Sequence, residues 1–331
     1  MFDIVIPIWK METKYLKTCL ESVLAQTHQE YKCYIIDGTP TDWEDYDAQM
    51  RMLKPILKDR RFEYHRHRNL EKPFVSEAMN QGAELGSNPY IQFIGGDDFF
   101  YSHHFKTMKE NIECEPTPEE VGVYFCMVQM NKKRIIDLGE SKLGQVRTYI
   151  MNHYLIHPFL QKDLLKYFHS ATPILMNGAV FNREIFQEIG GFQEDMVYSE
   201  DTDLVMKILL KDYHIRWFPY IGAYLRVGKH QSTVEGEVPY DREREFKRCD
   251  ELYIKRYSEY LLGNRSIESA NEQLTEVMGE MQPKGLVESM WGVAQGGYKY
   301  LSSKLVEDKE AIFILKTEEE EKLFMEGDIV L

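Results

Sequence analysis

The stretch from Tyr90 to Phe100 reads YIQFIGGDDFF and joins an apolar run to two glycines and two adjacent carboxylates. The apolar run predicts a short buried strand. Like charges side by side at a strand end repel each other and resist burial. The pattern therefore indicates either a solvated turn or a site for Mg²⁺ or Mn²⁺, which prefer oxygen ligands. Gly95 and Gly96 would let a bulky charged ligand approach the backbone.

The first hundred residues alternate strand-like and helix-like segments. Predicted strands cover residues 2–7, 34–36, 62–65 and 90–94, and predicted helices cover 15–24, 41–58 and 75–85. The sequence Thr41-Asp42-Trp43-Glu44 resembles a capping box at the start of the second helix. This alternation predicts an α/β domain with a mostly parallel sheet and helices on both faces. Ligands of such sheets bind beyond the carboxyl ends of the strands, where Asp37 and Asp97 are expected.

The second half continues the core and then changes character. Strands are predicted over 121–128 and 179–181, a short helix over 182–189 that ends on glycine, and an apolar helix over 204–210 that follows the acidic residues 199–203. After about residue 240 the pattern is helical and charged. We therefore predict an α/β domain over 1–235, with a nucleotide-binding half (1–100) and an acceptor half (101–235). A mainly helical C-terminal extension is predicted over 236–331.

The composition is that of an ordinary soluble globular protein. The 331 residues are 43% hydrophobic and carry a formal net charge of -14, which argues against general binding to nucleic acid or anionic membranes. The segment from Arg51 to Arg68 is locally basic, and the tail around Glu318 to Glu321 is acidic. Five scattered cysteines suggest reduced thiols. Because no apolar stretch approaches the roughly 18 residues that span a bilayer, we expect a cytoplasmic protein without a transmembrane segment.

Several common catalytic motifs are missing from the sequence. It contains no G-x-x-x-x-G-K-[ST] phosphate loop, no G-x-G-x-x-G after the first strand and no G-x-S-x-G elbow. These absences weaken the interpretations as a P-loop nucleotidase, a dinucleotide dehydrogenase or an α/β-hydrolase. The remaining candidates are acidic side chains at the ends of elements: Asp37, Asp97, Asp98, Glu200, Asp201 and Asp203. Glu200 and Asp201 could equally complement a helix dipole.

In combination these segments resemble family 2 glycosyltransferases of the GT-A fold, a Rossmann-like architecture, over residues 2–229. The opening IVIPIWKMETKYLKTCLESVLAQTHQEYKCYIIDGTPTD is similar to the family's first strand, helix and acidic turn. VSEAMNQGAELGSNPYIQFIGGDD is similar to its D-x-D-type metal segment. MNGAVFNREIFQEIGGFQEDMVYSEDTDLVMKILLKDYHIRWFP is similar to its acceptor-side segment, which ends in an E-D pair. The three segments occur in the family's order.

The resemblance implies a set of donor-side residues. Asp37 would bind the nucleotide base, uracil, with Pro7 and Trp9 beside the nucleotide, and Asp97 would hold Mn²⁺ or Mg²⁺ on the diphosphate of a sugar nucleotide. Asp98 and His230 would be further metal ligands. On the acceptor side, Asp201 would be the catalytic base with Glu200 beside it. His153, His157 and Asn177 are weaker candidates for contacts with the acceptor.

Two departures from the family pattern bear on these roles. Gly38 replaces the second Asp of the acidic turn, and Gly95 replaces the first carboxylate of the D-x-D motif. A Q-x-x-R-W motif is also missing, because Tyr213 stands where it would have Gln. The missing Q-x-x-R-W motif favours transfer of one sugar over synthesis of a polymer. With that, the resemblance implies a metal-dependent, inverting hexosyl- or pentosyltransferase that moves one sugar to a hydroxyl of a saccharide or glycoconjugate. The alternatives are a phage-type enzyme acting on a hydroxylated DNA base, with the basic segment as the DNA surface, and a non-catalytic nucleotide-sugar-binding protein.

Overall fold

The computed structural model describes residues 1–132, 147–151, 174–196 and 200–226, together with residues 241, 244, 245, 247, 248 and 252. The first half contains β1 (Phe2–Ile8), α1 (Thr13–Leu24), β2 (Tyr31–Asp37), α2 (Tyr46–Ile56), β3 (Phe62–Arg66), α3 (Val75–Leu85), β4 (Tyr90–Phe93), β5 (Phe99–Phe100) and α4 (His104–Glu113). The second half contains η1 (Pro118–Glu120), β6 (Val121–Lys132), β7 (Arg147–Met151), η3 (Met176–Gly178), β8 (Ala179–Asn182), α6 (Arg183–Glu188), α7 (Glu200–Leu210) and β9 (His214–Leu225).

These strands form one mixed sheet in the order β3-β2-β1-β4-β8-β6-β9-β5, with β7 beside β6. The half built from β3, β2, β1 and β4 is parallel, as the strand and helix alternation predicts. In the other half β8 runs antiparallel to both β4 and β6, and β5 runs antiparallel to β9. The pair of β6 and β9 is parallel. The prediction of a mostly parallel sheet is wrong for the other pairs of the second half, because an apolar run does not encode the direction of its strand.

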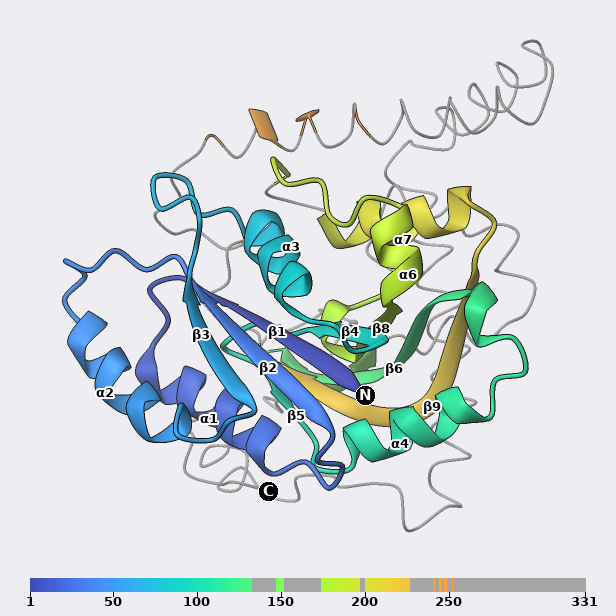
Figure 1. Ribbon diagram of the computed structural model, residues 1–331, viewed down its shortest axis with the longest axis horizontal. Coiled ribbons are helices and arrows are strands. Elements are labelled where there is room, and N and C mark those ends of the chain that lie inside the picture. Colours follow the sequence, from blue (N-terminus) through green and yellow to red (C-terminus); the bar gives the residue numbers. More distant parts are fainter. Residues whose placement is uncertain are drawn as a thin grey trace, which may run out of the picture.

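Helices cover both faces of the sheet, as predicted (Figure 1). On one face α1, α2 and α4 bury Leu16, Leu53 and Phe105 against the strands. On the other face α3, α6 and α7 bury a second cluster that includes Phe186 and Leu204. Burial of these two apolar clusters supplies the main driving force for the fold. Within the described part of the chain, no helix is long and apolar enough to cross a membrane.

Helix boundaries differ from the sequence expectation at two places. Helix α2 begins at Tyr46 rather than Thr41, because turn hydrogen bonds from Trp43 N to Pro40 O and from Tyr46 N to Trp43 O precede it. The predicted capping box therefore does not form. Helix α7 begins at Glu200, so the acidic residues lie inside its first turn. The predicted helical extension lies almost wholly outside the described residues.

The short helix α6 follows its prediction. Its N-cap is Asn182, whose side chain accepts hydrogen bonds from the backbone N–H groups of Glu184 and Ile185. Gly190 and Gly191 follow the helix with φ angles of 79° and 60°. These positive φ values favour glycine, so the Gly-Gly pair ends the helix as the sequence predicts.

Candidate active site

Acidic residues from two strands meet at the carboxyl edge of the parallel half. Asp37 is the last residue of β2 and lies opposite Ile8 of β1. On the other side of β1, β4 pairs through Phe93 with Val5, and Asp97 and Asp98 follow four and five residues later. The ends of β1, β2 and β4 therefore place these carboxylates at one edge, as the sequence predicts. Pro7 and Trp9, both half-buried, lie at the end of β1 between them.

Asp37 is fully buried and held by three donors. Its Oδ1 accepts a hydrogen bond from Thr39 N at 2.7 Å. Its Oδ2 accepts from the Tyr64 hydroxyl at 2.6 Å and from Arg66 Nη1 at 2.7 Å. The Arg66 guanidinium also lies 5.6 Å from the centroid of the Tyr46 ring. The carboxylate thus has a fixed position and a paired cation.

Sequence reasoning missed Tyr64 and Arg66. Burial and the hydrogen bond to Asp37 raise the pKa of Tyr64, which keeps its hydroxyl as a donor. The signal was present in the sequence, because residues two apart on a strand share a face and the end of β3 pairs with the end of β2. Polar side chains at 64 and 66 could therefore have been placed beside Asp37.

The structure gives a steric reason for glycine at position 38. A Cβ atom built there would lie 2.6 Å from Cβ of Pro73 and 3.6 Å from Cδ1 of Trp9. An aspartate therefore cannot replace Gly38 unless Pro73 moves. His67 connects this proline to Asp37, because its backbone N–H donates to Asp37 O at 2.9 Å and its Nε2 lies 3.2 Å from the carbonyl oxygen of Phe74, next to Pro73.

Asp98 is buried, whereas Asp97 is half-buried beside it. Asp98 Oδ1 accepts a hydrogen bond from Arg226 N at 2.7 Å, and Oδ2 accepts from Asn177 Nδ2 at 2.7 Å. Burial, followed by the neighbouring Asp97 charge, raises the pKa of Asp98 well above its ordinary value. Asn177, which the sequence predicts to contact the sugar acceptor, thus binds Asp98. Its contact with the sugar acceptor stays a prediction.

The residues at the turn after β4 fit a divalent cation that shares its ligands with a diphosphate. A Cβ atom at Gly95 would lie 2.7 Å from Asp97 Oδ1 and 3.2 Å from Asp98 Oδ2, so both carboxylates reach the same side of this glycine. Within the described residues, no group of three or more His, Cys, Asp or Glu side chains could hold a metal. One or two protein carboxylates together with substrate phosphates are the usual Mg²⁺ environment. His230 lies outside the described residues.

Arg226, at the end of β9, brings a positive charge to the acidic turn. It is 1% exposed, its Nε donates to the Asp97 carbonyl oxygen at 2.8 Å, and its guanidinium lies 4.4 Å from the centroid of the Tyr15 ring. A buried arginine stacked on an aromatic ring keeps its charge and a fixed orientation. The site therefore combines two carboxylates and one cation.

Glu200 and Asp201 form the first turn of α7. Asp201 Oδ1 accepts a hydrogen bond from Thr202 N at 2.7 Å. The segment before this helix is fixed to α3, because Ser76 Oγ at the start of α3 donates to Met196 O at 2.5 Å. Burial, followed by the charge of Asp201, raises the pKa of Glu200 to about 8. Glu200 is therefore mostly protonated at neutral pH. His153 and His157, the other predicted acceptor residues, lie outside the described residues.

The raised pKa of Glu200 predicts a pH-dependent stability. An unfolded chain releases this proton near 4.5, whereas the folded chain holds it to about 8. The folded state binds more protons between these values, so its free energy of unfolding falls as the pH rises from about 5 to about 8. Glu200→Gln removes this loss, worth roughly 3 kcal/mol for a partly exposed group. Urea unfolding at pH 5.5 and 8 would measure the free energy of unfolding of both chains, with Glu184→Gln, at an exposed position, as the control. If the free energy of unfolding changes with pH equally in the native chain and in Glu200→Gln, the prediction is wrong.

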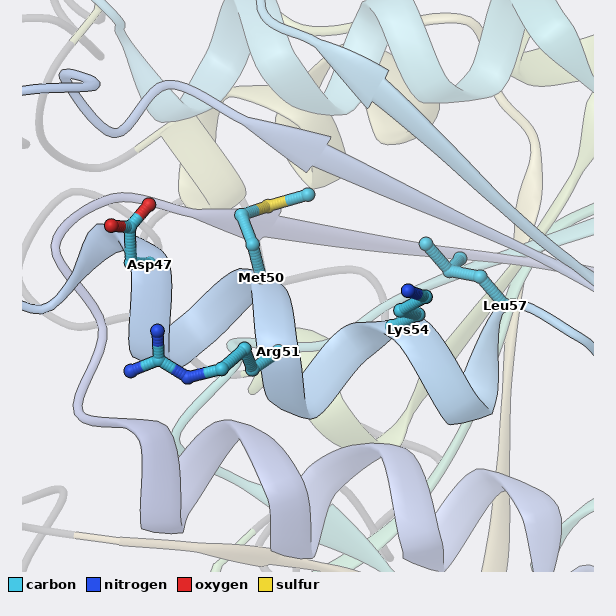
Figure 2. Close-up of a pocket in the computed structure, with 5 residues that line it drawn as sticks. All are labelled: Asp47, Met50, Arg51, Lys54 and Leu57. Carbon is cyan, nitrogen blue, oxygen red and sulfur yellow. The ribbon is translucent and has the colours of Figure 1, made fainter.

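The basic segment contributes less free positive charge than its sequence suggests. Arg61, Arg66 and Arg68 each form an ion pair with a carboxylate. An open groove of about 430 Å³ runs along α2 and is lined by Asp47, Met50, Arg51, Lys54 and Leu57 (Figure 2). None of these lining residues belongs to the acidic edge described above. The groove is therefore separate from the candidate active site.

Comparison with known proteins gives the same family along most of the described chain. The model of the family "Glycosyl transferase family 2" matches residues 3–190, and that of "Glycosyl transferase family group 2" matches residues 127–264. The uncharacterized glycosyltransferase EpsJ of Bacillus subtilis is 24% identical over 218 residues, which are 61% of this chain and 54% of EpsJ. A PGL/p-HBAD biosynthesis glycosyltransferase of Mycobacterium bovis is 33% identical over 101 residues, which are 30% of this chain and 37% of that protein.

Solved structures share the fold at low sequence identity. The crystal structure of S. aureus TarS 1-349 in complex with UDP-GlcNAc has a TM-score of 0.56 and 15% identity. The match covers 84% of this chain and 71% of the TarS chain. Since a family model covers residues 3–190, more than half of the sequence, this chain belongs to glycosyl transferase family 2 and has its GT-A fold.

Proposed function

We propose that the chain is an inverting glycosyltransferase that moves one sugar from a uridine diphosphate sugar to a hydroxyl of a saccharide or glycoconjugate. The observation that carries this proposal is that Asp37 and Asp97 lie at the carboxyl ends of β2 and β4, the two strands that flank β1, in a family 2 chain. The complex of the similar TarS structure with UDP-GlcNAc supports the choice of nucleotide.

Asp37 is proposed to select the base. Its Oδ1 accepts one hydrogen bond within the described chain, and a carboxylate oxygen can accept two. We propose that the uracil N–H donates to it while Tyr64 and Arg66 hold the carboxylate in a fixed orientation. Trp9 and Pro7 would lie against the nucleotide from the end of β1.

Asp97 is proposed to hold Mn²⁺ or Mg²⁺ together with the diphosphate. When bound, the cation neutralises negative charge on the departing diphosphate. Arg226 adds a fixed positive charge at the same turn through its contact with the Asp97 carbonyl oxygen. Gly95 leaves the carboxylate side of the turn free of a side chain.

Asp201 is proposed to act as the general base. It takes the proton of the acceptor hydroxyl, whose oxygen bonds to the anomeric carbon while the bond to the diphosphate breaks. A single displacement from the opposite face inverts the anomeric carbon. Glu200, protonated at neutral pH, adds no second charge next to the base. The missing Q-x-x-R-W motif favours transfer of one sugar over synthesis of a polymer.

A thermal-shift panel tests the donor proposal. UDP and UDP-sugars with Mn²⁺ are expected to raise the melting temperature of the native chain by several degrees, because a ligand that binds only the folded state stabilises it. Asp97→Asn should lose most of this shift, whereas substitution of the exposed Asp47 on α2, Asp47→Asn, should keep it. A native chain that responds to no nucleoside diphosphate would refute the proposal.

Gly38 and Gly95 favour the alternative of a nucleotide-sugar-binding protein without catalysis, and a donor shift without any transfer would support it. The DNA alternative loses ground because three arginines of the basic segment are already paired. We also propose a cytoplasmic location, in accord with the buried thiols of Cys19 and Cys33, which form no disulfide. The division into a donor half, an acceptor half and a C-terminal extension remains part of this proposal.

A further inference from the structure

Asp98 is engaged by protein groups on both of its carboxylate oxygens. Arg226 N donates to Oδ1 and Asn177 Nδ2 donates to Oδ2, each at 2.7 Å. Asp97, next to it, is more exposed, and its Oδ1 lies nearer to the Gly95 side of the turn than Asp98 Oδ2 does. We propose that Asp98 is a positioning residue rather than a metal ligand, and that Asn177 and Gln92 hold it in place. This inference rests on the proposed donor site.

A chain of buried polar groups supports Asp98 from within the sheet. Gln92, on β4 and fully buried, donates from Nε2 to the Asn177 carbonyl oxygen at 3.1 Å. The same Nε2 lies 2.7 Å from Nε2 of His104 at the start of α4. Gln92 therefore connects η3, which carries Asn177, with α4. Both contacts use the amide nitrogen, whereas Gln92 Oε1 is buried without a hydrogen-bond partner among the described residues. The two contacts of Nε2 therefore fix how this amide is oriented.

His104, at the far end of this series of hydrogen bonds, has a defined protonation state. Burial lowers the pKa of His104 to about 3, so the ring is neutral. Since Gln92 donates to Nε2, the ring proton lies on Nδ1, 3.1 Å from the Tyr220 hydroxyl of β9. A Cβ atom at Gly222 would lie 2.2 Å from this Nδ1, so the glycine leaves room for the ring.

The consequence for the site is the position of Arg226. By accepting its backbone N–H, Asp98 sets where the chain leaves β9. This placement brings Arg226 Nε within 2.8 Å of the Asp97 carbonyl oxygen. Asp98 thus ties the end of β4, η3 and the end of β9 together, and acts on the ligand through Asp97 and Arg226.

Isosteric substitutions separate positioning from metal binding. In Asp98→Asn the amide oxygen can still accept from Arg226 N, and its NH₂ can donate to the Asn177 amide oxygen once that amide rotates. We expect UDP affinity with Mn²⁺, measured by calorimetry, to stay within about threefold of native, whereas Asp98→Ala and Asn177→Ala weaken it about tenfold. Asp97→Asn should be as defective as Asp97→Ala. Asn111→Ala, which removes an amide in α4, is the matched control.

Hydrogen exchange at the Arg226 amide provides a readout that needs no ligand. Exchange should be about tenfold faster or more in Asp98→Ala and Asn177→Ala, and close to native in Asp98→Asn and Asn111→Ala. If Asp98→Asn loses UDP affinity as strongly as Asp97→Asn, or if Arg226 exchange is unchanged in Asp98→Ala, the inference is wrong. If the native chain binds no UDP but the exchange pattern holds, the proposed function fails and the positioning role of Asp98 stands.

Discussion

Asp201→Asn is expected to slow sugar transfer by about a thousandfold while UDP affinity stays near native. Removing a general base typically costs between a hundredfold and ten-thousandfold in rate. Asp201 lies at the start of α7, whereas the donor group Asp37 ends β2 and the donor group Asp97 follows β4. Its loss should therefore lower kcat and leave the donor KM almost unchanged. Single-turnover kinetics with the UDP-sugar that stabilises the native chain would measure it.

Glu200→Gln is the matched comparison for this prediction. Glutamine mimics the protonated side chain that burial favours at neutral pH, so the variant should keep transfer within about tenfold of native. Unchanged binding of UDP would show that both variants are folded. If Glu200→Gln loses most of its transfer rate while Asp201→Asn remains active, Asp201 is not the base and Glu200 is.

The position of Asp37 and Asp97 at one edge of the sheet could be predicted because it depends on short-range sequence patterns. The strand ending at Asp37 and the strand before Asp97 are apolar runs, and the helices between strands force them to be parallel. Parallel strands place their carboxyl ends at one edge, so two acids that are distant in sequence become neighbours of β1. The steric role of Gly38 lies beyond such reasoning, because it depends on Pro73, which comes from another loop.

The rest of the site depends on long-range contacts that carry no local signature. Asn177 reads as an isolated polar residue, and only the fold places its amide 2.7 Å from Asp98. Arg226 follows a strand whose direction no sequence pattern fixes, yet its backbone N–H meets the same carboxylate. The capping-box motif at Thr41 did not start the helix, because hydrogen bonds of a turn precede α2 instead. Tertiary contacts decided the first two outcomes, and local turn hydrogen bonds decided the third.

Arg183→Ala is expected to destabilise the chain by about 4 kcal/mol, because it leaves a buried carboxylate without its cation. Asp3, fully buried on β1, accepts from Arg183 Nη2 at 2.5 Å. Arg183 also donates from Nη1 to Ala83 O at 2.6 Å. Asp3 further accepts from Asn88 N at 2.8 Å, so one carboxylate joins β1, the start of β4 and α6. Urea unfolding of the native chain and the variant would measure the loss.

The comparison with an exposed ion pair makes this prediction specific. Lys106→Ala removes a pair with Glu110 whose side chains are 61% and 60% exposed, and it should cost under about 0.5 kcal/mol. Replacing both members of the buried pair, as in Asp3→Leu with Arg183→Leu, should cost less than Arg183→Ala alone, because no charge is then left unpaired. Equal losses in Arg183→Ala and Lys106→Ala would mean that the buried pair does not hold β1 to α6. Since Trp9 directly follows β1, which lies between the strands that lead to Asp37 and Asp97, loosening this contact should also weaken UDP binding.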